Sequence, residues 1–358
     1  MNGAAPAPAA QPGRGAVLLE EIREQPDALR RVCDGAAAFA AVARLLEGRD
    51  LVRLVAHGSS DNAASYGVYA LGILAGRTAM RDSISLSIYY GADIDFRRSA
   101  VVALSQSGRT PDVIEYVERA RRRGAITIAI TNEAESDLAA AADAVLPLGV
   151  GVEHAVAATK TYSAQLAALA LLAAASAGRL DEVADGIRAT AELLRGLLPV
   201  LEARLSEIAV SLAFVGRMFV IGRGPEYATA REISLKLLET CRIAAEPLTA
   251  TDLVHGPVAA IDGLFPVWTI AADDESLRAV REATAQARAA GATVIASGTA
   301  AEAIEGAAVV LPVPAPPLPL LTPLLSVAPG QLLAWALAQA KGLDPDRPAG
   351  LAKVTLAR

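Results

Sequence analysis

The sequence predicts an α/β protein made of two tandem doubly wound domains, each a parallel sheet with helices on both faces. Short β-branched apolar runs alternate with helical segments along the chain, which is typical of buried parallel strands and their crossover helices. The pattern occurs twice, because Arg53–Gly58 aligns with Arg217–Gly222 at an offset of 164 residues (222 − 58). The same offset carries the apolar run at Val101 onto Phe265. We therefore expect two halves of similar build.

Composition indicates a globular, mildly acidic chain. Its 358 residues are enough for two domains of ordinary size. The net charge of −6 argues against a nucleic-acid partner or an anionic membrane surface, although a local site can still bind a small anion. The two cysteines, Cys33 and Cys241, have neither metal-site nor disulfide-framework spacing. We therefore expect no metal and a reducing, cytoplasmic location.

The expected elements of the first domain follow the chain in order. Residues 1–15 are rich in alanine and proline and are expected to be disordered. Leu18–Val32 is predicted to be helical, and Pro26 either starts a second helix or kinks the first. The first domain, 16–195, is predicted to contain three strands, at Leu51–Ala56, Val101–Leu104 and Ala125–Ile130. Helices that begin near Asp61 and Pro111 are expected to separate them.

Helices between about Leu180 and Val210 are expected to join the two domains. The second domain, 196–343, is predicted to contain a helix over Tyr227–Ile243, after which Pro247 and a polar turn follow. Its strands are expected at three apolar runs: Met218–Ile221, Phe265–Ala271 and Gly291–Ala296. Residues 344–358 form the C-terminal tail.

Two apolar stretches are not predicted to cross a membrane. Ser163–Gly178 is short and alanine-rich, and is expected to be a buried helix. Gly306–Ala340 carries no charge but contains seven prolines, which disfavour a membrane helix. We therefore expect no membrane partner.

A hydroxyl-rich loop follows the second predicted strand. Ser105, Ser107 and Thr110 bring hydroxyl donors, and Gly108 lets the backbone approach a ligand closely. Pro111 suits the first turn of a helix that Thr110 would cap, and a helix N-terminus favours phosphate. Plain N-capping is the alternative for such a loop.

A second observation favours a phosphate site over plain caps. Gly58-Ser59-Ser60 offers a similar arrangement after the neighbouring strand. The second repeat instead has an acidic sequence, Ala272–Ser276, at the place that corresponds to the hydroxyl-rich loop. This asymmetry suggests function rather than fold, and the two loops together suit a single phosphate group.

An acid–amine face is predicted on the helix of the second domain. Glu232, Lys236 and Glu239 stand at i, i+4 and i+7, so they project from one side. A solvated salt-bridge face is the ordinary alternative. However, this helix follows the carboxyl end of a strand, where open α/β sheets bind ligands, and His255 and Gly256 come soon after it. Because these groups move protons near neutral pH, we predict a catalytic role.

With these features the chain resembles the SIS (sugar isomerase) family, whose domains are flavodoxin-like. It is similar to the isomerase half of the glutamine–fructose-6-phosphate amidotransferases and to stand-alone SIS-type glucosamine-6-phosphate deaminases. The resemblance covers nearly all of the chain from about Glu20 and rests on segments that occur in order: Glu21–Pro26, Ser105–Gly108, Val156–Lys160, Glu232–Glu239, His255–Pro257 and Pro348–Thr355.

The resemblance implies a role for each candidate residue. Sugar phosphate would be held by Ser60, Ser105, Gln106, Ser107 and Thr110, with Gly58 and Ser59 as further substrate contacts. Glu239 would move a proton between C1 and C2, and Lys236 would assist at the C1 oxygen. His255 would open the sugar ring from a neighbouring subunit, which implies a homodimer with a shared active site.

The C-terminal tail also has an implied role. Lys353 would engage the open-chain carbonyl, with Glu232 in support, whereas without the resemblance it would be expected to be a solvated tail residue. A lysine amine can form a Schiff base with a ketone, and this chemistry needs no cofactor. We expect His57 and His154 to be structural.

The function we predict is that of a glucosamine-6-phosphate deaminase, which yields fructose 6-phosphate and ammonia. No cysteine precedes Cys33, so no glutaminase activity is expected. A fructosamine-6-phosphate deglycase or a hexose-phosphate isomerase would use the same groups. A non-catalytic sugar-phosphate sensor would keep the phosphate loops, but it would not need Glu239, Lys236, His255 and Lys353 together.

Overall fold

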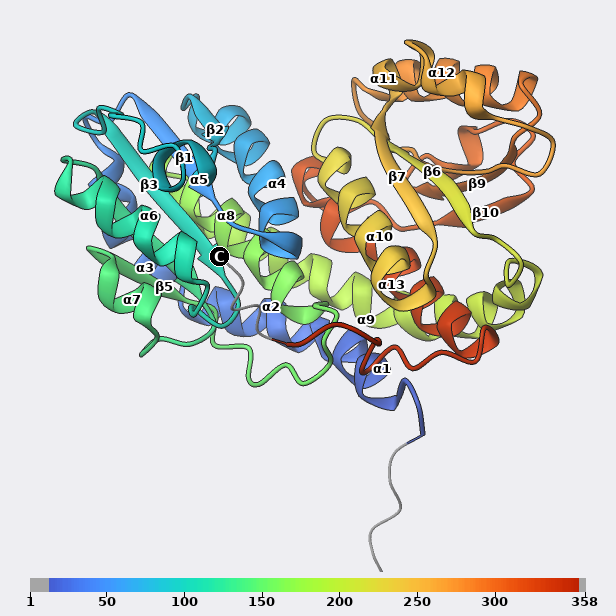
Figure 1. The fold of residues 1–358 in the computed structure, drawn as a ribbon, viewed down its shortest axis with the longest axis horizontal. Helices are drawn as coiled ribbons and strands as arrows, with labels where there is room; N and C mark the ends of the chain where they lie inside the picture. Colours follow the sequence, from blue (N-terminus) through green and yellow to red (C-terminus); the bar gives the residue numbers. More distant parts are fainter. Residues whose placement is uncertain (1–12, 354–358) are drawn as a thin grey trace, which may run out of the picture.

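The computed structural model describes residues 13–353, which form two five-stranded parallel sheets (Figure 1). The first sheet has the order β2 (Ala79–Arg81), β1 (Leu51–Val55), β3 (Ser99–Ser105), β4 (Ile126–Thr131) and β5 (Ala144–Pro147). The second has the order β10 (Val309–Pro312), β9 (Thr293–Gly298), β8 (Pro266–Ile270), β6 (Arg217–Gly222) and β7 (Ala244–Thr249). Two tandem doubly wound domains are therefore confirmed.

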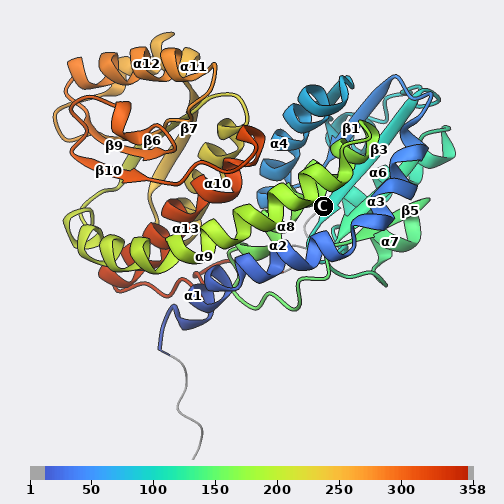
Figure 2. The same cartoon turned by 180° about the vertical axis from the view of Figure 1, so that it is seen from behind.

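Helices cover both faces of each sheet, as Figures 1 and 2 show from opposite sides. The helices before and within the first domain are α1 (Ala16–Arg23), α2 (Gln25–Asp34), α3 (Ala36–Ala43), α4 (Gly58–Ala75), α5 (Ile84–Ile88), α6 (Pro111–Arg122), α7 (Asp137–Ala141) and α8 (Lys160–Ser176). The remainder are α9 (Leu180–Ser211), α10 (Glu226–Cys241), α11 (Ala250–Val254), α12 (Leu277–Ala289) and α13 (Pro323–Ala340). Four short 3₁₀ turns are η1 (Arg44–Leu46), η2 (Pro257–Ala260), η3 (Ala301–Ala303) and η4 (Pro319–Leu321).

Strand β3 shows how a sheet is buried on both faces. Ala100, Val102 and Leu104 pack into a large core, whereas Val101 and Ala103 pack into a separate core beneath α6. Side chains alternate between the faces because successive residues of a strand point in opposite directions. The large core continues from α4 and α8 to α10 and α13, so the two domains share one apolar interior.

The pairing register is the same in the two sheets. Leu54 pairs with Val102 and Val220 pairs with Trp268, so each pair joins residues 48 positions apart (102 − 54 and 268 − 220). This equal spacing agrees with a single offset that carries both central strands of the first sheet onto those of the second.

Three local predictions differ from the structure. The segment Gly58–Ser60 is the first turn of α4 rather than a turn before it. The domains are joined by the single 32-residue helix α9, which contains Pro199. The polar turn predicted between Pro247 and His255 is instead the end of strand β7 followed by helix α11. Pro247 itself lies in β7, whose place at the edge of the sheet explains why a proline is tolerated there.

The segment around Asp346, late in the chain, contacts the start of α1. The described residues do not include 1–12 and 354–358. Most of the N-terminal segment expected to be disordered and the end of the C-terminal tail therefore lie outside them. The carboxylate of Asp346 accepts hydrogen bonds from the N–H groups of Gly15 and Leu18 at 2.9 and 2.8 Å. This contact supplies the N-terminus of α1 with acceptors from the opposite end of the chain.

The two apolar stretches form buried helices. Ser163–Gly178 corresponds to most of α8, whose residues from Lys160 to Ala174 are buried. One helical stretch in the described part of the chain, Pro319–Ala340, has the length and composition of a membrane span, and 94% of its most apolar window is buried. Helix α13 in this stretch packs against α9 and α10 as part of the core.

Candidate active site

The hydroxyl-bearing segments lie at one edge of the first sheet, at the place where open α/β sheets have their ligand crevice. Strands β1 and β3 are parallel neighbours, so the residues that follow them meet at the same edge. The order β2-β1-β3-β4-β5 places the reversal of winding between these two strands. Open α/β sheets bind ligands at such a topological switch point.

The loop after β3 is built on a glycine. Gly108 has a φ of +62°, and a Cβ atom there would lie 2.0 Å from Ser136 Oγ. Its N–H donates to Ser105 Oγ at 3.0 Å, and the N–H of Arg109 donates to Ser107 Oγ at 3.3 Å. Packing within the protein therefore requires glycine at this position, in addition to any approach of a ligand.

Thr110 lies at the N-cap position of α6, and Pro111 begins that helix. The Thr110 side chain makes no capping hydrogen bond and instead lies 3.4 Å from Ser105 Oγ. The Thr110 hydroxyl therefore does not cap α6, which was the alternative role for this loop. Nearby, His57 Nε2 and Asp112 Oδ2 are 2.7 Å apart and join the two crevice segments.

The other predicted phosphate ligands have different surroundings. Ser60 is buried in the first turn of α4, where its Oγ accepts a hydrogen bond from Gln165 Nε2 at 2.9 Å. Gln106 is half-buried, and its main-chain oxygen accepts from the N–H of Asn132 at 3.2 Å. Gly58 begins α4 with a φ of +56°, which favours glycine.

The acid–amine face of α10 is buried against the first domain. Helices α4 and α10 pack together between the sheets (Figure 1). Lys236 Nζ lies 3.5 Å from Glu232 Oε1 and 2.6 Å from Glu239 Oε2. Ser59 Oγ and Asn62 Nδ2, both from α4, donate to Glu232 at 2.9 and 2.8 Å. The solvated salt-bridge alternative is wrong, because the side chains of Glu232 and Lys236 are 0% and 2% exposed.

Burial and charge set the protonation of this cluster. Burial raises the pKa of Glu232 to about 7, although Lys236 and the hydrogen bond from Asn62 act to lower it. Desolvation acts to lower the pKa of Lys236, but the attraction of Glu232 and Glu239 raises it above its ordinary value. Lys236 is therefore held as an ammonium group, and Glu232 can exchange a proton near neutral pH.

Lys353 is bonded to a buried acid, Glu153, whose charge acts on Lys236. Lys353 Nζ lies 2.9 Å from Glu153 Oε2 and donates to the main-chain oxygen of Ala155 at 2.7 Å. The charge of Glu153 also contributes to the raised pKa of Lys236. The structure therefore does not show Lys353 as a freely solvated tail residue.

His255 is not brought to the α10 cluster within one chain. It follows α11 and is exposed. Among the described residues, its main-chain N–H bonds to Asp252, and no hydrogen bond or ion pair involves its imidazole. The chain thus gathers Glu232, Lys236 and Glu239 directly and Lys353 through Glu153, and it leaves His255 apart.

Two side chains of this region were missed by the sequence analysis. Asn62 lies one helical turn after Ser59, but nothing in the local pattern indicates that it bonds to Glu232. Glu153 is the single acid between Asp143 and Asp181, and this isolation is the signal that could have drawn attention to it.

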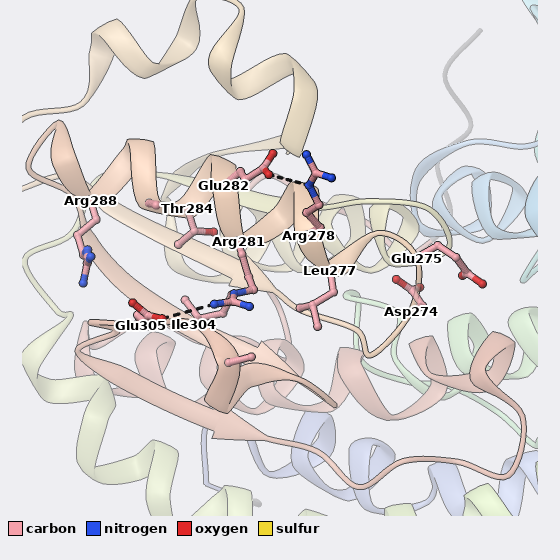
Figure 3. Close-up of a pocket in the computed structure, with 12 residues that line it drawn as sticks. Asp274, Glu275, Leu277, Arg278, Arg281, Glu282, Thr284, Arg288, Ile304 and Glu305 are labelled. Carbon is pink, nitrogen blue, oxygen red and sulfur yellow. Dashed lines mark hydrogen bonds and ion pairs between the residues drawn. The ribbon is translucent and has the colours of Figure 1, made fainter.

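A surface hollow of ≈ 650 Å³ lies along α12 in the second domain (Figure 3). Much of its charged lining is paired, with Arg278 bonded to Glu282 and Arg281 bonded to Glu305. It is lined by residues between Asp274 and Glu305, and none of these is a predicted site residue. The candidate active site is therefore defined by the buried cluster and the crevice of the first sheet.

Fold and site together define a tandem doubly wound α/β protein whose hydroxyl-bearing loops lie at the switch point of its first sheet. The SIS domain family matches residues 46–175 and 211–338, which is most of the chain. The chain belongs to the SIS domain family.

Individual relatives agree with this assignment. A glutamine–fructose-6-phosphate aminotransferase (isomerizing) from Aeropyrum pernix is 36% identical over 97% of this chain, which spans 58% of that relative's length. The solved C-terminal domain of glucosamine-fructose-6-phosphate aminotransferase from Francisella tularensis has a TM-score of 0.85 and 27% identity, covering 95% of this chain and 100% of that one. A glucosamine-6-phosphate deaminase from Thermotoga maritima shares the fold, with a TM-score of 0.74, 24% identity and coverage of 95% and 100%.

Proposed function

We propose that this chain is a phosphosugar isomerase that works as a glucosamine-6-phosphate deaminase. It would convert glucosamine 6-phosphate and water into fructose 6-phosphate and ammonia. The observation that carries the proposal is the buried Glu232–Lys236–Glu239 cluster, which α4 holds beside the crevice of the first sheet. Membership of the SIS domain family and the aminotransferase relatives support a sugar phosphate as the substrate class.

The phosphate end of the substrate is assigned to the first domain. Hydroxyl and amide donors would hold it: Ser60, Ser105, Gln106, Ser107 and Thr110. The N-terminus of α6 adds main-chain N–H groups and a favourable dipole. Gly58 and Ser59 would contact the sugar itself, which would then extend toward α10.

Glu239 is the proposed base for proton transfer. In the open-chain aldehyde it removes the proton from C2 and delivers it to C1, while a proton passes from the C2 amino group to the C1 oxygen, so that the 2-amino aldose becomes the C2 imine of the ketose. The Lys236 ammonium stabilises the negative charge that develops on the C1 oxygen. Water then adds to the C2 imine, and cleavage of the C2–N bond releases ammonia and leaves the ketone of fructose 6-phosphate.

Three further groups complete the proposed site. Glu232 supports Lys236, Lys353 engages the open-chain carbonyl, and His255 opens the sugar ring. Because His255 is exposed and makes no side-chain bond within its own described chain, we assign it to the site of a second copy. The proposed protein is thus a homodimer with two shared sites.

The proposal is tested by measuring ammonia and fructose 6-phosphate in parallel, from purified protein supplied with glucosamine 6-phosphate. The expected result is equal amounts of both products in the wild type and neither in Glu239→Gln. Binding without turnover would contradict the deaminase, and fructosamine 6-phosphates would then test a deglycase. Aldose–ketose interconversion without ammonia would identify an isomerase, and binding with no turnover of any of these substrates would identify a sensor.

A further inference from the structure

Glu153 has no part in the reaction proposed above, yet its carboxylate is the most completely bonded acid near the site. It lies between β5 and α8, and its side chain is 0% exposed. Oε1 accepts from the N–H groups of Thr159 and Thr161 at 2.9 and 3.1 Å. Oε2 accepts from Thr161 Oγ1 at 2.7 Å and from Lys353 Nζ at 2.9 Å. The first turn of α8 therefore fixes where this carboxylate lies.

Glu153 is also held in its charged form. Burial acts to raise its pKa, but the charge and hydrogen bond of Lys353, with the bonds from Thr159 and Thr161, bring it below its ordinary value. A buried carboxylate without a cation would be strongly destabilising. Within residues 13–353, Lys353 is the cation that forms an ion pair with it.

The segment that carries Lys353 has few other anchors. Leu351 and Ala352 are exposed, and the N–H of Leu351 donates to Pro348 within the same segment. The bonds that join this segment to the first domain are those from Lys353 Nζ to Glu153 and to Ala155. Upstream, the tail is held at Asp346, whose main-chain oxygen accepts from the N–H of Val156. Between Asp346 and Lys353, the place of the chain therefore depends on the Lys353 ammonium group.

We propose that Glu153 is a positioning residue that holds the Lys353 ammonium beside the Glu232–Lys236–Glu239 cluster. The inference rests on the proposed function, in which Lys353 meets the open-chain carbonyl. Glu153 is anchored by α8 and Lys353 is anchored by Glu153, so the tail lysine has a defined position before the substrate binds. Such preorganisation matters because small displacements of a reacting group cost much of its rate.

Glu153→Gln is designed to keep the bonds of this side chain to α8 and to remove its ion pair with Lys353. The amide oxygen can still accept from the two N–H groups, and the NH₂ group can donate to Thr161 Oγ1. That NH₂ group would face the Lys353 ammonium as a second donor, so the contact with Lys353 is lost. The folded state of the variant is checked by circular dichroism. If it does not fold, Glu153→Asp, whose charge is drawn back by one methylene, takes its place.

The first readout is the reactivity of Lys353 without substrate. Trace acetylation with acetic anhydride, followed by peptide mass spectrometry, gives the labelling rate of each lysine in the full chain. We expect a severalfold faster rate at Lys353 in Glu153→Gln, and an unchanged rate at Lys341, whose Nζ donates to Val215. Glu21→Gln is the matched control, because Glu21 accepts from Ala155 N–H in the same loop but does not bond to Lys353.

The second readout is a double-mutant cycle on turnover. Glu153→Gln is expected to lower kcat on the order of 10²-fold with little change in KM. In a Lys353→Ala background, the same change should add little, because Glu153 acts through Lys353.

Equal labelling of Lys353 in the wild type and in Glu153→Gln would overturn the inference, as would fully multiplicative losses in the cycle. If the wild type turns over no sugar phosphate, the proposed function fails. The labelling experiment still decides whether Glu153 holds Lys353.

Discussion

Asn62 Nδ2 donates a 2.8 Å hydrogen bond to Glu232 Oε2 and thereby joins residues 170 positions apart. Asn62 lies on α4, which follows the first strand of the first repeat, and Glu232 lies on α10, which follows the first strand of the second. The bond therefore links corresponding helices of the two repeats. It sets the acid–amine face of one domain beside the end of α4 where the proposed phosphate site of the other domain lies.

Glu239→Gln should abolish turnover and leave sugar-phosphate binding nearly intact. The amide keeps the shape of the side chain but cannot take the C2 proton, and general-base catalysis typically contributes about 10²–10⁴-fold. Steady-state kinetics and calorimetric titration with fructose 6-phosphate measure the two effects separately. Glu246→Gln, a change at an exposed acid on β7, is the control and should behave as the wild type. Full activity in Glu239→Gln would rule out its assignment as the base.

Ser107→Ala should raise KM and change kcat little. The lost hydroxyl would bond to a charged phosphate, an interaction worth about 1.5–3 kcal/mol, so KM is expected to rise roughly tenfold or more. Ser276→Ala, at the start of α12 in the second repeat, removes a hydroxyl from the acidic counterpart loop and should leave KM unchanged. Equal effects of the two substitutions would contradict a phosphate site in the first repeat alone.

Gly108→Ala should destabilise the protein more than Gly149→Ala. Both glycines have a φ above +60°, but a Cβ atom at Gly108 meets Ser136 Oγ at 2.0 Å, whereas at Gly149 it meets nothing within 4 Å. The left-handed backbone alone costs about 1–2 kcal/mol, and the clash should add about 1–3 kcal/mol. Urea unfolding of the two variants measures the difference, and equal losses would show that the loop simply moves aside.

Glu226, the first residue of α10, is a buried acid of a different kind. Among the described residues, neither of its carboxylate oxygens has a hydrogen-bond partner of ordinary geometry. Burial raises its pKa from 4.5 to about 7, and the nearby hydroxyls of Thr229 and Ser326 offset only part of this increase. Between pH 4.5 and about 7, Glu226 is therefore mostly protonated in the folded protein and mostly ionised in the unfolded chain.

The pKa of Glu226 is higher in the folded protein than in the unfolded chain, so the free energy of unfolding falls as pH rises from about 4.5 to 7. Above that range the whole of this destabilisation is present. Glu226→Gln should raise the free energy of unfolding at pH 8 on the order of 3 kcal/mol and leave it nearly unchanged at pH 4.5. Chemical unfolding at both pH values measures this change. Glu302→Gln, at an exposed acid, is the control. No gain at pH 8 would mean that Glu226 stays neutral or finds a partner.

His255→Ala and Glu239→Gln should complement each other when mixed. Each variant alone is expected to be inactive, whereas a heterodimer would contain one site with an intact Glu239 from one subunit and an intact His255 from the other. Random exchange between equal amounts of the two should therefore restore about a quarter of the wild-type activity. Activity after co-refolding is the measurement. No restoration, with exchange verified by mass, would contradict a shared site.

The sequence predicted most of the candidate site by chemical type and by place along the chain. Ser105, Ser107 and Thr110 could be selected as candidates because they follow a recognisable strand and precede a helix start. The spacing of Glu232, Lys236 and Glu239 placed them on one face of a helix. Whether that face meets water or another helix depends on the partner surface, which a local pattern does not contain.

By itself, the sequence determined the two tandem α/β domains, the strands of their centres and the residues at the strand ends. Apolar runs and helical periodicity arise from neighbouring residues, so they can be read locally. Tertiary structure alone decided the bond from Asn62 to Glu232 and the ion pair of Glu153 with Lys353. Each of these depends on which surfaces meet across long stretches of chain. Periodicity specifies the face that a residue occupies but not the partner that covers it.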